Sequence, residues 1–165
     1  ALERAENNNI KTRVLPRKSF PDSVTYSRAV LSALDEEKAD LVVLAGFMTI
    51  LTEDVTKAYA YRIINVHPAL IPSFCGAGYY GLKVHEAALA YGVKYSGATV
   101  HFVNEVADAG AIILQKPVEV MKNDTPETLQ KRIMEQAEWN ILPQAVSLFC
   151  QDKIEIIDDK AYIKE

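Results

Sequence analysis

The run Leu41-Val42-Val43-Leu44-Ala45-Gly46 constrains the fold most, because no position in it carries a polar side chain. A strand with one face in water alternates polar and apolar residues, whereas a strand that is apolar throughout needs cover on both faces. Helices packed on both sides of a parallel sheet provide that cover. The run therefore predicts a central strand in an α/β fold, three-layered and Rossmann-like, with a mostly parallel sheet.

The other segments alternate between helix and strand patterns, as this class requires. Capping residues mark helix starts at Asp22 or Ser23, at Thr52 and at Thr125, the last followed by a proline. The expected helices are a short one ending at residue 6, then 22–38, one beginning at 52, 82–91 and 125–149, the last kinked at Pro143; the expected strands are 11–15, 41–46, 62–65, 98–103 and 112–115, followed by a hairpin over 154–163. No linker divides the 165 residues, which predicts one domain, 1–165.

Composition excludes several functional classes. The net charge of −4 comes from mixed signs without a basic cluster, so we expect no nucleic-acid partner. No apolar run reaches the roughly 20 residues of a membrane span and no leader opens the chain, which predicts a soluble, cytoplasmic protein with no membrane partner. Cys75 and Cys150 lack metal-ligand spacing and are expected to be free thiols, with no metal bound.

A polar cluster at a strand end is the strongest functional signal. The strand over 62–65 stops at Asn65-Val66-His67-Pro68, and proline cannot continue a sheet. In open α/β folds, ligands bind at the carboxyl edge of the strands. The strand at 98–103 runs into a loop with Asp108, which we expect to reach the same edge. We therefore predict that Asp108 lies within hydrogen-bonding or one-water reach of His67, with Asn65 alongside.

These residues carry a resemblance to a known family. Ala45-Gly46-Phe47-Met48, the stretch from Asn65 to Ser73 and Gly97 to Val103 with the following Asp108 closely resemble the phosphoribosylglycinamide formyltransferases of the formyl-folate transferase superfamily. The resemblance covers almost the whole chain. It implies transfer of a formyl group from the co-substrate 10-formyltetrahydrofolate to the amine of glycinamide ribonucleotide, in de novo purine biosynthesis. It also implies no metal, no covalent enzyme intermediate, and a monomer or homodimer.

Roles follow from the same resemblance. His67 would be the general acid, Asn65 would hydrogen-bond the formyl oxygen, and Asp108 would orient the imidazole and favour its charged form. The implied folate contacts are Met48, Thr49, Ile50, Leu51, Asn65, Val103, Val106 and Ala107. The implied nucleotide contacts are Gly46, Val66, Pro68 and Glu138, whose carboxylate would receive the glycinamide amine.

Five departures from the family pattern bear on binding. Thr49 and Ser23 stand where relatives often carry arginines near the folate tail, so Arg17 or Lys18 would have to substitute. Ala109 and Ala111 replace a glycine and a proline after Asp108, which predicts strain at any positive φ and a looser loop. The family's phosphate-binding turn has no counterpart in the chain, so we expect an amino-terminally incomplete catalytic domain that binds formyl-folate analogues weakly and glycinamide ribonucleotide hardly at all.

Other functions and residue roles remain open at this stage. A formyltetrahydrofolate deformylase shares the Asn, His and Asp, although Pro68 and Glu138 favour the transferase; a non-catalytic folate-binding remnant is a third hypothesis. Structural or supporting roles are expected for His85 and His101, and packing against the sheet for Trp139. Cys75 has no base beside it and is not expected to be a nucleophile. The glycine-rich stretch 76–81 predicts a mobile flap rather than a dinucleotide loop.

Overall fold

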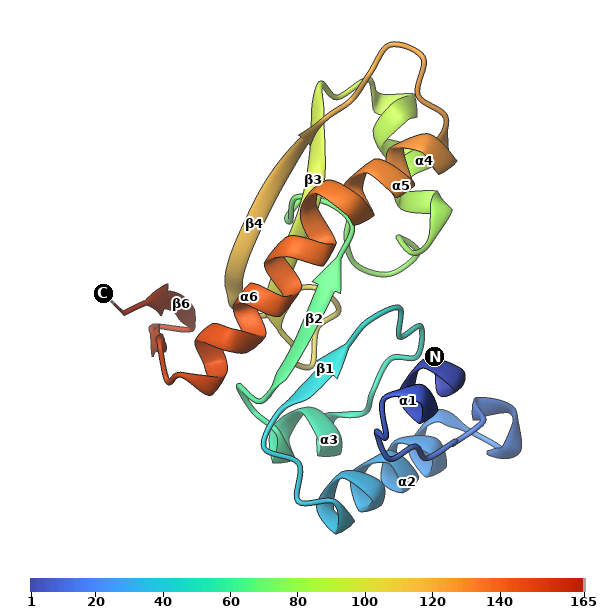
Figure 1. Ribbon diagram of the computed structural model, residues 1–165, viewed down its shortest axis with the longest axis vertical. Helices are drawn as coiled ribbons and strands as arrows, with labels where there is room; N and C mark the ends of the chain where they lie inside the picture. Colours follow the sequence, from blue (N-terminus) through green and yellow to red (C-terminus); the bar gives the residue numbers. More distant parts are fainter. Residues whose placement is uncertain (165) are drawn as a thin grey trace.

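The computed structural model describes residues 1–164 and has an α/β fold, as the sequence predicts. A four-stranded sheet runs in the order β1 (Val42–Leu44), β2 (Ile63–His67), β3 (Tyr95–Phe102) and β4 (Ile112–Glu119) (Figure 1). β1 and β2 are parallel, but β3 is antiparallel to both of its neighbours. The expectation of a mostly parallel sheet is therefore wrong for the described residues. The short loop between β3 and β4 is one reason, because a parallel pair needs a crossover of a dozen residues or more.

The helices begin where capping residues predict. α2 (Ser23–Glu36) is capped by Asp22, whose Oδ1 accepts from the Thr25 N–H at 2.7 Å, and α4 (Leu82–Tyr91) ends at Gly92 with a φ of 81°. α1 (Leu2–Asn7) and α3 (Glu53–Ala58) also lie where expected. Residues 11–15 form no strand and lead instead into a 3-10 turn, η1 (Arg17–Ser19), so that prediction is wrong. The segment lies outside the sheet and gains no ladder partner there.

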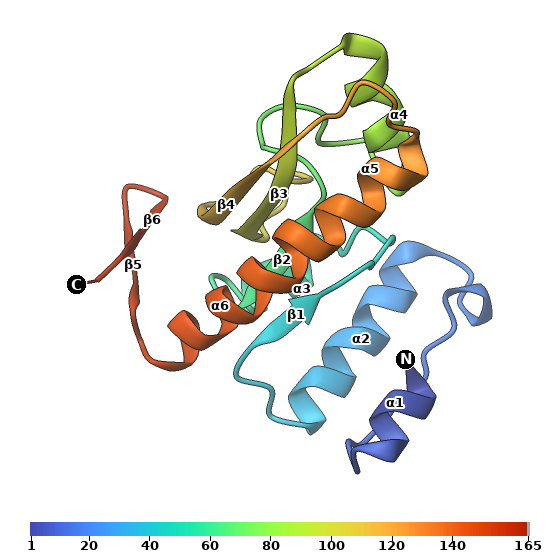
Figure 2. The ribbon, with the colours of Figure 1, turned by 45° about the horizontal axis from the view of Figure 1, so that its top comes forward.

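Two hydrophobic cores lie on the two faces of the sheet. Ile63 and Ile64 are both fully buried, and as strand neighbours they point to opposite faces. Ile64 belongs to a core with the inner faces of α5 (Pro126–Ile133) and α6 (Trp139–Cys150). Ile63 packs on the other face with Val55 of α3 and with Tyr59, the residue after that helix. The long carboxyl-terminal helix crosses one face, and α2 lies on the other side of β1 (Figure 2). This arrangement confirms the three layers.

β1 was expected at the centre of the sheet and lies at its edge. Among residues 1–164, β1 pairs only with β2, and Val43 is 41% exposed. The two central strands of the sheet are instead β2 and β3, each of which pairs with a strand on both sides. An all-apolar run favours cover on both faces, yet Val43 leaves one face of β1 partly exposed, and the run carries no information on which strands pair laterally.

The long helix predicted over 125–149 has three parts. α5 (Pro126–Ile133) leads into one π turn, η2 (Met134–Glu138), and then into α6 (Trp139–Cys150). We predicted a kink at Pro143; the irregularity lies one turn earlier. A proline ring clashes with the carbonyl four residues before it, which is that of Trp139, the first residue after the widened turn. π turns occur often at functional sites, and this one carries Glu138.

The loop between β3 and β4 turns back sharply onto β3. The Phe102 N–H donates to the Ala111 carbonyl at 2.8 Å, and a Cβ on Gly110 would lie 1.9 Å from the Phe102 carbonyl oxygen, so only glycine fits there. The positive φ in this loop belongs to Asp108, at 56°, and not to Ala109. The strain predicted for Ala109 is therefore absent, while Asp108 adopts a conformation that non-glycine residues use sparingly.

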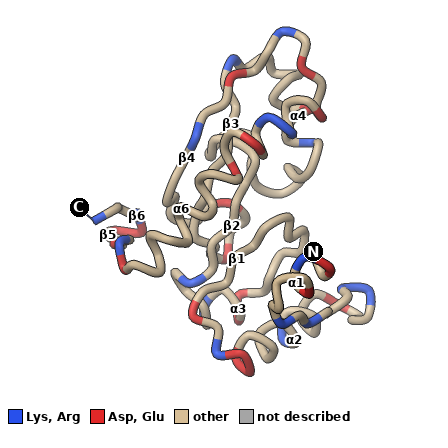
Figure 3. The backbone as a smooth tube through the Cα atoms, in the orientation of Figure 1, with Lys and Arg blue, Asp and Glu red and all other residues tan. Residues whose placement is uncertain are grey.

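The carboxyl-terminal hairpin, free thiols and dispersed charge agree with the sequence. β5 (Ile154–Ile157) and β6 (Lys160–Ile163) pair antiparallel around Asp158 and Asp159. Cys75 and Cys150 are unpaired. Acidic and basic residues alternate along the chain without forming a basic stripe (Figure 3). Within residues 1–164 no helix has the length and apolar character to span a membrane.

A buried ion pair ties the loop after β4 to α5 and yields a stability prediction. Both Asp124 carboxylate oxygens accept from the Arg132 guanidinium at 2.6 Å, and the Asp124 side chain is 2% exposed. The Arg132 hydrogen bonds hold the pKa of Asp124 at about 2, below its ordinary 3.8. We expect Asp124→Asn to lower the free energy of unfolding by on the order of 2 kcal/mol at neutral pH.

The sign of the pH dependence follows from the lowered pKa. Asp124 contributes stability above its unfolded pKa of 3.8 and loses that contribution as the pH falls toward about 2. The stability difference between wild type and Asp124→Asn should therefore be constant near pH 6 and shrink from pH 4 to pH 2, as measured by urea unfolding. Asp152→Asn, which breaks an exposed pair with Lys164, is the matched control and should change little. If the stability difference between wild type and Asp124→Asn stayed constant down to pH 2, the low pKa assigned to Asp124 would be contradicted.

Candidate functional site

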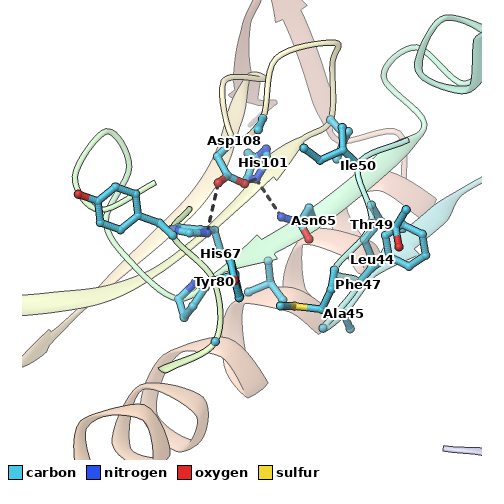
Figure 4. A pocket seen from close by; sticks show the side chains of 18 of the residues that line it. Leu44, Ala45, Phe47, Thr49, Ile50, Asn65, His67, Tyr80, His101 and Asp108 are labelled. Atoms are coloured by element: carbon cyan, nitrogen blue, oxygen red, sulfur yellow. Dashed lines mark hydrogen bonds and ion pairs between the residues drawn. The ribbon is translucent and has the colours of Figure 1, made fainter. Parts of the chain in front are cut away.

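A large cleft opens at the carboxyl end of β1 and β2. Its volume is about 1140 Å³, larger than most pockets for one small molecule. One wall is the segment after β1, residues 44–51; the others come from the end of β2, the glycine-rich stretch 76–81, the loop after β3, and the helix face around the π turn. Figure 4 shows Asn65, His67, His101 and Asp108 converging between these walls.

Asp108 and His67 meet as predicted. His67 Nδ1 lies 3.5 Å from Asp108 Oδ2, and Asn65 lines the same cleft beside them. The topological reason we expected is wrong, however, because β3 is antiparallel to β2 and its carboxyl end points away from His67. Asp108 reaches the imidazole because the loop after β3 folds back along the sheet face that carries Asn65, His67 and His101. A register shift between Val100 and His101 lies at the same place, as β-bulges often do beside active sites.

His67 is buried and its proton position is determined by its neighbours. Its Nε2 lies 2.8 Å from the carbonyl oxygen of Phe74, which can only accept, so Nε2 carries a proton. Burial lowers the pKa of His67 below its ordinary value and outweighs the raising effects of Phe74 and Asp108. As expected, Asp108 favours the charged form of His67, but desolvation of the buried ring has the larger effect.

The Asp108 carboxylate lies close to Gly76, His101 and His67. Its Oδ2 accepts from the Gly76 N–H at 2.8 Å, and its Oδ1 lies 3.6 Å from His101 Nε2. The His101 ring, and then the Gly76 N–H and His67, hold the pKa of Asp108 below its ordinary value against the opposing effect of burial. The carboxylate is therefore ionised at neutral pH.

His101 connects Asp108 to Asn65. Its Nδ1 lies 2.7 Å from the Phe102 carbonyl oxygen and donates to it, which leaves Nε2 to accept from the Asn65 amide at 3.2 Å. The Asn65 amide nitrogen has two N–H groups, so one remains to donate to a ligand. His101 is 1% exposed and holds Asn65 in place, which agrees with the supporting role expected for it. His85 is fully buried and does not line the cleft.

Glu138 lies on the opposite wall of the cleft, on the π turn. Burial raises the pKa of its carboxyl above the ordinary value. In the part of the chain that the structure describes, Glu138 makes no ion pair and no side-chain hydrogen bond, and no Lys or Arg lines the cleft. A half-buried carboxyl without a cation favours a ligand that brings one.

The predicted binding residues line this cleft with one exception. Gly46, Met48, Thr49, Ile50, Leu51, Val66, Pro68, Val103 and Ala107 all contribute to its walls. Val106 does not, because it lies at the tip of the loop after β3, 62% exposed. Arg17 and Lys18, proposed as replacements for missing arginines, lie on η1 and do not reach the cleft.

Several site features escaped prediction. Trp139 was expected to pack on the sheet, but it is 62% exposed and lines the cleft, because the π turn rotates it outward from the core. The Phe74 carbonyl and the Gly76 N–H are backbone groups and leave no signature in side-chain patterns. The pairing of His101 with Asn65 could have been found from strand register, since these residues are directly opposite. Within residues 1–164, no group of three or more His, Cys, Asp or Glu side chains is arranged to hold a metal ion.

The charges around His67 make its titration predictable. Because Asp108 raises the pKa of His67 while burial lowers it, Asp108→Asn should lower that pKa further. Titration of the His67 ring by NMR is the measurement, with exposed Asp152→Asn as the control that leaves the pKa unchanged. A rise in the pKa of His67 on removal of the Asp108 charge would show that the two groups do not interact as the geometry indicates.

Comparison with known proteins agrees with this site. The model of the Formyl transferase family matches residues 1–146. The chain is 39% identical over 158 residues to the chloroplastic phosphoribosylglycinamide formyltransferase of Arabidopsis thaliana, covering 95% of this chain and 54% of that protein. It thus spans about half the length of that relative.

Solved structures give the same result. Glycinamide ribonucleotide transformylase 1 from Symbiobacterium toebii superposes with a TM-score of 0.91 at 35% identity, covering 99% of this chain and 74% of that one. A formyltetrahydrofolate deformylase from Pseudomonas syringae is more distant, at 29% identity and a TM-score of 0.82 over 99% of this chain and 53% of that one. The chain belongs to the formyl transferase family.

Proposed function

We propose that the protein transfers a formyl group from 10-formyltetrahydrofolate to the amine of glycinamide ribonucleotide in de novo purine biosynthesis. Its relatives named phosphoribosylglycinamide formyltransferase and glycinamide ribonucleotide transformylase support this proposal. One observation carries the proposal: Glu138, a carboxyl without a cationic partner, faces the cleft that also holds Asn65, His67 and Asp108. The two hydrophobic cores pack on opposite faces of one sheet, which supports a single catalytic domain over residues 1–165.

The size and lining of the cleft suit two substrates. A volume of about 1140 Å³ accommodates a folate and a nucleotide side by side. We assign the apolar wall from Met48 to Leu51, with Val103 and Ala107, to the folate. Gly46, Val66 and Pro68 are assigned to the nucleotide, next to Glu138. The reacting groups then meet at Asn65 and His67.

Asn65 and His67 supply what the chemistry requires. When an amine attacks a formyl carbon, the carbonyl oxygen gains negative charge and the nitrogen gains positive charge. The free N–H of Asn65 can donate to that oxygen. His67 acts as the general acid once its Nδ1 has taken up a proton, because Nε2 is already committed to Phe74.

Asp108 makes that proton exchange favourable during the reaction. His67 is neutral at rest because burial lowers its pKa. A proton that arrives at Nδ1 faces the Asp108 carboxylate 3.5 Å away, and the resulting ion pair stabilises the imidazolium. A group that gains and loses a proton easily is better suited to catalysis than one fixed in either state.

Glu138 is placed to bind and deprotonate the amine that accepts the formyl group. A substrate ammonium must lose a proton before its nitrogen can attack, and the raised pKa of Glu138 makes this carboxylate a better proton acceptor than an exposed one. The same charge binds the amine by a charge-assisted hydrogen bond.

A deformylase is the second candidate, because the same Asn, His and Asp would serve an attacking water. It is favoured by the similarity to the Pseudomonas syringae structure but leaves Glu138 without a role. Incubation of the protein with 10-formyltetrahydrofolate, with and without glycinamide ribonucleotide, separates the two. We expect deformylation only when the ribonucleotide is present, with formylated product formed in equal amount; release of formate without it would support the hydrolase.

His67→Ala tests the proposed acid. We expect formyl transfer to fall by about 10²–10³-fold, because the group that exchanges a proton at Nδ1 during the reaction is lost. Folate-analogue binding should change little, since the imidazole is committed to Phe74 and Asp108 at rest. His85→Ala is unsuitable as a control because it opens the core, so the conservative control is His67→Asn, which keeps a polar group of similar size at this position. Near wild-type turnover in His67→Ala would remove His67 from the mechanism.

Glu138→Gln tests the amine contact. Loss of the charge should raise the KM for the ribonucleotide by about 10-fold or more, while the KM for the folate stays the same. Steady-state kinetics with each substrate varied in turn is the measurement, and Glu135→Gln on the same turn, outside the cleft lining, is the matched control. Equal effects on both substrates would contradict the assignment of Glu138 to the amine.

A further inference from the structure

The loop after β2 supplies two backbone groups to the reacting pair. The Phe74 carbonyl fixes the proton of His67, and the Gly76 N–H orients the Asp108 carboxylate, each at 2.8 Å. A shift of this loop would therefore disturb both members of the pair at once. What holds the loop in place is accordingly part of how the site is built.

Thr99 and Gln115 hold the start of that loop. Thr99 is fully buried on β3, directly opposite His67, and Gln115 is its partner on β4. The Thr99 hydroxyl donates to the Ala69 carbonyl at 2.7 Å and accepts from the Ile71 N–H at 3.1 Å and the Gln115 amide at 3.0 Å. The Gln115 amide also donates to the Ile71 carbonyl at 2.9 Å. One hydroxyl thus uses its donor and both of its acceptor sites.

The close approach at Gly97 indicates that the loop has little freedom at this point. A Cβ on Gly97 would lie 2.8 Å from a Leu70 methyl group and 2.2 Å from the Lys116 carbonyl oxygen. Leu70 therefore lies directly against β3, between the two residues that Thr99 binds.

We propose that Thr99 and Gln115 are positioning residues for the reaction, acting through the loop that carries Phe74 and Gly76. Neither side chain lines the cleft, so neither touches a substrate. Their hydrogen bonds fix residues 69–71, and the turn that follows, in which the Ser73 N–H donates to Leu70 at 2.9 Å, carries that position on to Phe74. The expected effect on kcat rests on the proposed function. The expected effect on the His67 ring rests on the geometry alone.

A matched pair of substitutions tests the hydroxyl without changing the volume of the side chain. Thr99→Val removes the hydroxyl and keeps the shape, whereas Thr99→Ser keeps the hydroxyl. We expect Thr99→Val to lower kcat by about 10–100-fold, with little change in the KM for either substrate. The substitution would misplace His67 and Asp108 without removing a contact to a substrate. Thr99→Ser should stay within about threefold of wild type. Gln115→Leu, at an exposed position, should give a smaller loss in the same direction and provides a second variant if Thr99→Val does not fold.

A spectroscopic readout separates positioning from general destabilisation. In ¹⁵N NMR of the His67 ring, wild type and Thr99→Ser should show the proton on Nε2, while Thr99→Val and Gln115→Leu should show a mixture of tautomers or a shifted pKa. Unchanged His67 spectra together with unchanged kcat in both variants would overturn the inference, as would an equal loss in Thr99→Ser and Thr99→Val. Absence of formyl transfer in the wild-type protein would instead overturn the proposed function, and the His67 spectra would still decide whether the loop is positioned in this way.

Discussion

The site depends on one carboxylate held by a folded-back loop. Asp108 receives the Gly76 N–H and faces both His67 and His101, so it joins the loop after β2, the end of β2 and the face of β3. It can do so only because Gly110 leaves room against the Phe102 carbonyl and because Asp108 itself adopts a positive φ. Such conformations carry a cost of about 1–3 kcal/mol that the surrounding contacts must offset.

Burial sets the chemistry more than charge does. Desolvation lowers the pKa of His67 and raises that of Glu138, so two groups of opposite type are both shifted toward their neutral forms. Asp108 is the exception, because hydrogen bonds favour its ionised form. The cleft thus holds an ionised Asp108 beside two groups whose charged forms are disfavoured by burial. Such separation of environments allows several titratable groups to take different roles in one site.

Local sequence signals predicted the helices well and the sheet poorly. The α4 helix lies at the predicted residues because a glycine marks each of its ends, Gly81 before the first turn and Gly92 after the last. Strand direction and order depend on which segments pair across the chain, and neither the edge position of β1 nor the antiparallel β3 leaves a local mark. The strand expected over residues 11–15 is absent for the same reason, since a short segment becomes a strand only where a pairing partner is available.

The sequence alone determined the α/β class, the strand-end Asn65, His67 and Asp108, and the family, because these rest on residue types in a fixed order along the chain. Only the tertiary structure decided that Asp108 reaches His67 by a loop that turns back, that His67 is neutral, and that Trp139 faces the cleft rather than the core. Each of these depends on solvent exclusion or on backbone groups of Phe74 and Gly76. Desolvation and backbone position are properties of the packed molecule, and no single segment of sequence encodes them.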